Sequence, residues 1–162
     1  MPAEHQTEAE RRPSPFPFPP VLFACALIAA WLLGRAHPLP WPGLDDTPAR
    51  VIGLGFGLAG IALILWAAWT LHRGRTTIMP HRRSDHLVTN GPFRLRRNPI
   101  YLGETFIMLG VAEIDKNIWF VLLVPVFAAA ITWLAILPEE RHLEARFGDA
   151  WRAYKASSRR WI

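Results

Sequence analysis

The chain has 162 residues, of which 51% are apolar, and a formal net charge of +5. This length suffices for one domain and is short for two. The apolar residues are gathered into long runs, which is typical of an integral membrane protein and not of a soluble domain. The basic residues flank these runs, and this placement argues against nucleic acid as a partner.

The N-terminal part predicts a tail followed by a first membrane span. Residues 1–20 are charged and rich in proline, a composition that cannot pack a core and indicates a flexible lead-in. Residues 21–33 form an uninterrupted apolar run, which Arg35 extends by reaching toward the interface. The alternative is a cleaved signal peptide, but the acidic start and the poor cleavage site around Arg35 disfavour it.

The second span is predicted at residues 51–71, after a proline-rich loop at 37–50. At 1.5 Å per residue it is roughly 30 Å long, enough to cross a bilayer. Its Gly55-x-Gly57-x-x-Gly60 matches a dinucleotide-binding fingerprint, which functions only where a strand turns into a helix. No strand precedes it here. Gly53 and Gly57, four residues apart, instead favour close helix–helix packing.

Residues 72–98 form a polar connection that contains seven arginines. Gly91-Pro92 predicts a turn, and Pro99 is suited to begin the next helix. Arginines just before a helix N-terminus favour an anionic group, although juxtamembrane arginines can equally bind lipid phosphates. His81 and His86 lack a metal-ligand spacing, so no metal site is predicted.

Two further apolar segments follow, at residues 99–113 and 118–137. The first is short and is interrupted by Glu104, which should face the bundle or a polar cavity and not lipid. Because buried charges are usually paired, we favour an ion pair between Glu104 and an arginine over direct contact with a ligand.

The C-terminal residues predict an amphipathic helix on the membrane surface. Pro138-Glu139-Glu140 opens this helix, and an apolar stripe follows at spacings of four, four and three: Leu143, Phe147, Trp151 and Tyr154. Taken alone, the two glutamates are also what the first turn of an ordinary helix favours.

The distribution of lysine and arginine predicts the orientation. The 72–98 connection has seven and the tail after residue 138 has six, whereas the loops at 37–50 and 114–117 have one each. We therefore expect an all-α bundle of about four transmembrane segments, with both termini and the 72–98 connection cytoplasmic. Two segments distant in sequence, residues 87–101 and 139–154, then emerge on the same side and can form one site.

Two blocks of residues in these segments resemble a known family. The blocks read Gly91-Pro92-Phe93-Arg94 with Arg97-Asn98-Pro99-x-Tyr101-x-Gly103, and Glu139-Glu140-x-x-Leu143-x-x-x-Phe147-Gly148-x-x-Trp151-x-x-Tyr154. In this order and spacing they resemble the small integral-membrane methyltransferases, which include the isoprenylcysteine carboxyl methyltransferases and the phospholipid N-methyltransferases. The resemblance covers about residues 85–161.

The resemblance implies S-adenosylmethionine bound on the cytoplasmic side and a lipophilic methyl acceptor that enters from the bilayer. The cofactor-binding positions that it implies are Leu87, Val88, Phe93, Asn98, Pro99, Tyr101, Glu139 and Glu140, and the substrate-binding candidates are Arg94 and Arg97. Carboxylates favour the cationic cofactor, and aromatic rings can stack on its adenine. No catalytic residue is assigned, because methyl transfer is a direct displacement that needs alignment above all.

The chain departs from the family at two places. Many relatives have histidine at the position of Asn98, and asparagine cannot act as a base near neutral pH. The prenylcysteine enzymes carry an arginine shortly before the acidic pair to hold a substrate carboxylate, whereas residues 132–137 of this chain contain no cation. This favours a phospholipid amine over a prenylcysteine carboxylate as the acceptor.

The sequence therefore divides into a tail at 1–20, two N-terminal spans at 21–71 and a predicted catalytic region at 72–162. The alternative function is a non-catalytic membrane module that binds anionic lipid and oligomerises through Gly53 and Gly57 of its second helix. The sequence leaves the methyl acceptor and the oligomeric state open.

Overall fold

The computed structural model describes residues 19–74 and 87–162. Residues 1–18 of the predicted tail lie outside the described residues, and the first described helix already begins at Pro19. His81 and His86 also lie outside the described residues. The described elements are all helical, as predicted. In chain order they are α2 (Pro19–Ala36), α3 (Thr47–Arg73), the short 3-10 helix η1 (Gly91–Arg94), α4 (Pro99–Asp115), α5 (Ile118–Ile131), the π-helix η2 (Thr132–Ile136), α6 (Leu137–Phe147) and α7 (Asp149–Ser157).

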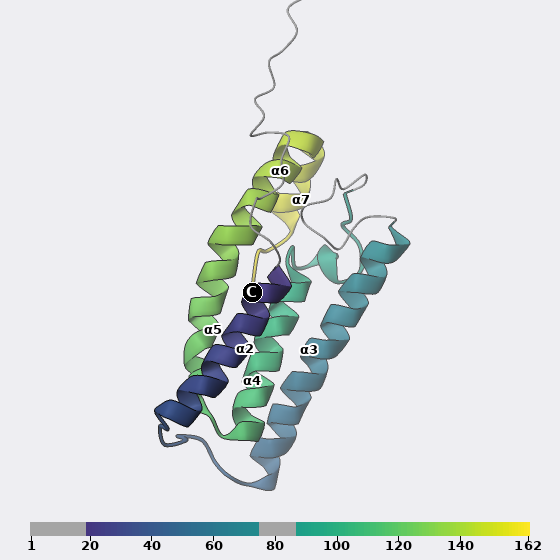
Figure 1. Ribbon diagram of the computed structural model, residues 1–162. Helices are drawn as coiled ribbons and strands as arrows, with labels where there is room; N and C mark the ends of the chain where they lie inside the picture. The colour runs from purple at the N-terminus through teal and green to yellow at the C-terminus, as the bar shows by residue number, and fades with distance from the viewer. Residues whose placement is uncertain (1–18, 75–86) are drawn as a thin grey trace, which may run out of the picture.

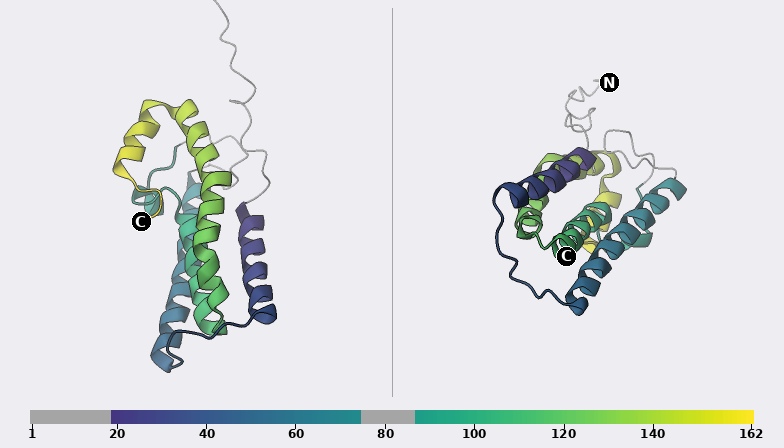
Figure 2. Two further views of the ribbon diagram at one scale, coloured as in Figure 1. Left: turned by 90° about the vertical axis from the view of Figure 1, so that its left-hand side faces the viewer. Right: turned by 60° about the horizontal axis from the view of Figure 1, so that its bottom comes forward.

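The helices form one bundle with a compact assembly at one end. Helices α2, α3, α4 and α5 run along the bundle in alternating directions, with α4 packed against both α3 and α5 (Figure 1). Helix α6 continues upward from α5, and α7 folds back beside the bundle (Figure 2). The start of α4, η1, α6, α7 and the C-terminal residues thus lie together, at what we call the α7 end.

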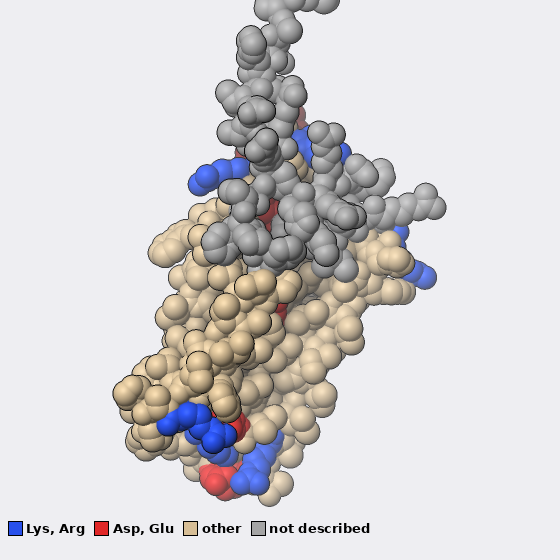
Figure 3. Space-filling view, in the orientation of Figure 1, with Lys and Arg blue, Asp and Glu red and all other residues tan. Residues whose placement is uncertain are grey.

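Within the described residues, three helices are long and apolar enough to cross a membrane. They are α2, α3 and the continuous helix Ile118–Phe147, which combines α5, η2 and α6. Helix α4 lies among them but has only 17 residues and carries Glu104 and Glu113. Large apolar side chains are exposed on α3, as lipid contact requires, and the middle of the molecule shows a largely uncharged surface (Figure 3). A helical membrane bundle is therefore confirmed, while a fourth crossing by α4 stays a prediction.

Glycines let α3 and α4 approach closely. A Cβ atom added to Gly60 would lie 2.5 Å from the Gly103 carbonyl oxygen, and one added to Gly110 would lie 2.6 Å from the Gly57 backbone nitrogen. A Cβ atom on Gly53 would lie 2.4 Å from the Glu113 side chain. The predicted glycine-mediated packing is thus confirmed, and it joins two helices of the same chain.

The C-terminal part differs from the prediction of a single amphipathic helix. The helix that begins at Ile118 does not end near residue 137 but continues through the π-helical turn η2 to Phe147. Gly148 then adopts φ +50°, a conformation that favours glycine, and ends α6. The regular apolar spacing across Gly148 suggested one helix, whereas the backbone reverses there and Trp151 and Tyr154 are buried on a separate helix, α7.

Candidate functional site

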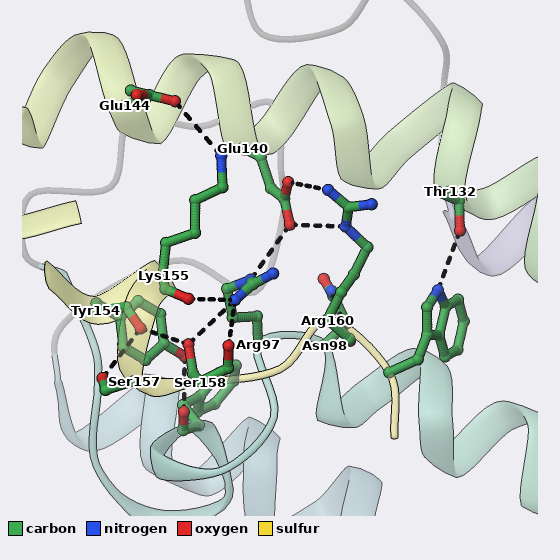
Figure 4. Close-up of polar contacts among 12 residues, drawn as sticks. Arg97, Asn98, Thr132, Glu140, Glu144, Tyr154, Lys155, Ser157, Ser158 and Arg160 are labelled. Atoms are coloured by element: carbon green, nitrogen blue, oxygen red, sulfur yellow. Dashed lines mark hydrogen bonds and ion pairs between the residues drawn. The ribbon is translucent and has the colours of Figure 1, made fainter. Parts of the chain in front are cut away.

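The two segments predicted to form one site do meet at the α7 end. The backbone nitrogen of Arg97 donates to the Arg159 carbonyl at 2.8 Å, and the backbone nitrogen of Arg159 donates to the Leu95 carbonyl at 3.1 Å. The residues after α7 therefore run beside the loop that leads into α4. This pairing places the start of α4, the first turn of α6 and the C-terminal residues around a common centre (Figure 4).

The Arg97 side chain holds this assembly together. Its Nε donates to Glu140 Oε1 at 3.3 Å, and its Nη1 donates to the carbonyl oxygens of Lys155, at 3.0 Å, and of Ser158 (Figure 4). Only 9% of the side chain is exposed. Arg97 was predicted to bind substrate, but in the structure its guanidinium is engaged by groups of the protein itself.

Glu140 is the acidic counterpart of this arrangement. Its two carboxylate oxygens accept from Nε and Nη2 of Arg160, at 3.0 and 2.6 Å, in addition to Arg97. A buried carboxylate that accepts a bidentate pair of hydrogen bonds from an arginine has its hydrogen-bonding capacity and its charge well satisfied. Glu140 thus links α6 to the C-terminal residues, and any direct contact with a cofactor would have to compete with two arginines.

Tyr154 fixes α7 to the 3-10 helix. Its hydroxyl donates to the Phe93 carbonyl at 2.7 Å, and the Tyr154 carbonyl accepts from the Ser158 hydroxyl at 2.6 Å. Burial raises the pKa of Tyr154 to about 12, so the phenol remains a hydrogen-bond donor throughout the neutral range. Phe93 is itself buried, and its position thus depends on α7.

Tyr154→Phe tests this contact. The change removes one hydroxyl and leaves the Phe93 carbonyl without its donor, so we expect the free energy of unfolding to fall by about 1–2 kcal/mol. Chemical unfolding in detergent, followed by circular dichroism, measures the loss. An unchanged unfolding midpoint would mean that the hydrogen bond contributes nothing to the position of α7.

Tyr101, Glu104 and Glu139 form a second group at the same end. Tyr101 is buried, and the carboxylates of Glu104 and Glu139 both lie within electrostatic range of its hydroxyl. Among the described residues, neither carboxylate has an ion-pair partner, and Glu104 Oε2 is buried without a hydrogen bond. The prediction that Glu104 faces the bundle is confirmed. The arginine partner that we favoured for it is absent from the described part of the chain.

The remaining predicted residues lie in the first turn of α4 and in the segment before it. Pro99 is buried in the first turn of α4, and the Asn98 side chain donates to the Arg160 carbonyl at 3.1 Å, which supports the C-terminal residues. Leu87 and Val88 are half-buried in the segment that leads to η1. Arg94 is exposed. Arg94 is therefore the one of the two predicted substrate-binding arginines whose surface is accessible.

The sequence reasoning missed the role of the last residues. Ser158 and Arg160 join the network around Arg97 and Glu140, and Trp161 Nε1 donates to Thr132 Oγ1 at 3.1 Å, in the π-helical turn. Arg160 was counted only as a positive charge on the tail. The available signal was the pair Arg159-Arg160 after the predicted helix, whose charge is opposite to that of the acidic pair Glu139-Glu140.

Comparison with known proteins identifies a family that the chain resembles. A family model described as phospholipid methyltransferase matches residues 48–150, from the first turn of α3 into α7. Neither a search of curated proteins nor a search of solved structures gave a match. The matched region includes α3, all of α4 and the acidic pair on α6.

Proposed function

The chain belongs to the phospholipid methyltransferase family, and we propose that it transfers a methyl group from S-adenosylmethionine to a lipid or small lipophilic acceptor, such as a phospholipid amine. The catalytic region in this proposal spans residues 72–162, and the site faces the cytoplasm, as the distribution of basic residues favours. One observation carries the proposal. Tyr101 and Glu139, from the two blocks that resemble the family, lie within electrostatic range of each other at one end of the bundle.

The residues at this end fit the cofactor. S-adenosylmethionine is a sulfonium cation with an ammonium group and an adenine ring. Glu139 is a carboxylate with no ion pair to any described residue, so it can accept hydrogen bonds from the cofactor and favour its charge. In this proposal Tyr101 and Phe93 offer aromatic surface to the adenine ring, and Leu87, Val88, Asn98 and Pro99 are further cofactor contacts. Glu140 already holds Arg97 and Arg160, which makes Glu139 the principal acidic contact.

When bound, the cofactor supplies an electrophilic methyl group, and the protein aligns the acceptor with it. No covalent intermediate with the protein is needed, so the chain's residues act by orientation and by exclusion of water. The burial of Tyr101 and Pro99, together with the C-terminal residues held by Arg97 and Asn98, gives the site a fixed frame.

The alternative function, a non-catalytic module that oligomerises through the glycines of its second helix, requires those glycines to lie on an exposed face. The face of α3 that carries Gly53 and Gly60 is occupied by α4 of the same chain. The exposed Arg94 can still contact lipid phosphates, but this is compatible with an enzyme that acts on lipids.

Binding of S-adenosylhomocysteine to the detergent-purified protein tests the proposal. We expect saturable binding that stabilises the fold by about 2.7 kcal/mol at a ligand concentration of 100 times Kd. Glu139→Ala should abolish this stabilisation with unchanged helical content. Glu144→Ala is the matched control, because Glu144 lies on the same helix but its side chain is 41% exposed and pairs with Arg152 and Lys155 of α7. Equal affinity of wild type and Glu139→Ala would remove Glu139 from the site, and no binding by wild type would refute the cofactor.

A further inference from the structure

Glu104 is a buried carboxylate that the assembly described above does not use. It is 6% exposed, and its Oε2 lacks a hydrogen-bond partner among the described residues. It follows Tyr101 by three positions and precedes Met108 by four, so the three side chains share one face of α4. Tyr101 and Met108 pack there in an apolar cluster with α5 and η2.

Such a carboxylate has no structural explanation in the described part of the chain. Burying an ionisable group in an apolar surrounding is costly unless the group is paired, and in a membrane protein it usually marks a functional site. Glu113, on the same helix, pairs with Lys116, and Glu140 pairs with two arginines. Glu104 has no such cation partner among the described residues.

The neighbouring π-helix is a second, independent feature of this place. Ala135 and Ile136 of η2 belong to the same cluster as Tyr101. A π-helical turn is less regular than an α-helix and occurs often at functional sites.

We propose that Glu104 binds the amino group of the methyl acceptor and takes up its proton. This rests on the proposed function, because it assigns a residue to the acceptor of that same site. Glu104 lies deeper along α4 than Tyr101, by about one helical turn. A lipophilic amine that enters from the apolar side therefore reaches Glu104 while Glu139 remains at the α7 end for the cofactor. The ligand class is an amine that carries at least one N–H group on an apolar tail.

The protonation step balances without a further reactant. A protonated amine has no free lone pair and cannot accept a methyl group. One N–H proton passes to the Glu104 carboxylate, which becomes a neutral carboxylic acid, and the N–H electron pair stays on nitrogen as the nucleophilic lone pair. The Glu104 carboxylate can accept this proton because its Oε2 has no hydrogen-bond donor among the described residues.

Binding of amine ligands to the full-length protein in detergent, followed by tryptophan fluorescence with saturating S-adenosylhomocysteine, tests the proposal. The probes are short-chain phosphatidylethanolamine, phosphatidylglycerol of the same chain length, and decylamine, an amine without phosphate. We expect wild type to bind phosphatidylethanolamine more tightly than phosphatidylglycerol. Glu104→Gln should weaken phosphatidylethanolamine binding roughly 30-fold, because it removes the charge and keeps the shape. Glu113→Gln is the matched control on the same helix and should leave binding unchanged.

The outcomes separate the possible roles. Weaker binding of both amines by Glu104→Gln, with S-adenosylhomocysteine affinity unchanged, supports the proposal. If Glu104→Gln loses affinity for phosphatidylethanolamine alone, the acceptor is a phospholipid. If it loses affinity for decylamine alone, the acceptor is a simple amine. A loss of S-adenosylhomocysteine affinity in Glu104→Gln would overturn it and assign Glu104 to the cofactor. Equal wild-type binding of phosphatidylethanolamine and phosphatidylglycerol would overturn it without any variant. Failure of wild type to bind S-adenosylhomocysteine, with amine binding intact, would refute the proposed function and leave the amine site.

Discussion

Replacing Arg97 with alanine should lower the free energy of unfolding by about 3–5 kcal/mol, because it leaves a buried carboxylate without one of its cations. The side chain is 9% exposed and bonds to Glu140 and to the carbonyl oxygens of Lys155 and Ser158. Its loss also leaves these carbonyls without a donor. We expect the residues after α7 to detach from the bundle before the membrane helices unfold.

Two measurements separate this expectation from a general effect of removing an arginine. Unfolding followed by circular dichroism gives the stability, and limited proteolysis after residue 157 reports the release of the C-terminal residues. Arg152→Ala is the matched control, because Arg152 is 57% exposed and pairs with the exposed Asp149, and exposed pairs contribute little. An Arg97→Ala variant as stable and as protease-resistant as Arg152→Ala would show that the network does not hold the C-terminus.

The helical segments could be predicted from the sequence because their apolar runs and their boundaries are local features. Asp46 is a good example. Its side chain accepts from the Ala49 backbone nitrogen at 2.8 Å and caps α3, five residues before the apolar run that predicted this span. The reversal at Gly148 was missed because the apolar side chains continue in helical spacing on both sides of it. Only the backbone conformation of that glycine separates α6 from α7.

The meeting of the two segments at one end of the bundle could be predicted, but which residue of each pair turns inward could not. Glu139 and Glu140 are neighbours, and adjacent residues on a helix point about 100° apart, so one faces the arginines and the other does not. Arg94, the last residue of η1, is exposed, whereas the side chain of Arg97, in the segment before α4, is buried. The inward residue of each pair depends on contacts that are distant in sequence, such as Arg97 with Ser158, 61 positions apart, and Glu140 with Arg97, 43 positions apart. No local pattern records these contacts.

The alanine variant of Gly60 should be the most disruptive single-methyl change on α3. Its Cβ would lie 2.5 Å from the Gly103 carbonyl oxygen and 3.0 Å from the Ile107 backbone nitrogen. Backbone atoms cannot rotate aside as a side chain can, so α3 and α4 must separate. Overpacking of this kind usually costs about 1–3 kcal/mol, and we expect the upper end of that range. Because α4 carries Tyr101 and Glu104, affinity for S-adenosylhomocysteine should fall as well.

Gly55→Ala supplies the control for this prediction on the same helix. No atom lies within 4 Å of a Cβ atom added at Gly55, and alanine favours a helix more than glycine does. This variant should therefore unfold at the same denaturant concentration as wild type or slightly above it. Equal destabilisation by both variants would mean that the glycines of α3 matter for the helix itself. A loss confined to Gly60→Ala shows instead that contact between α3 and α4 holds the start of α4, and the site with it, in place.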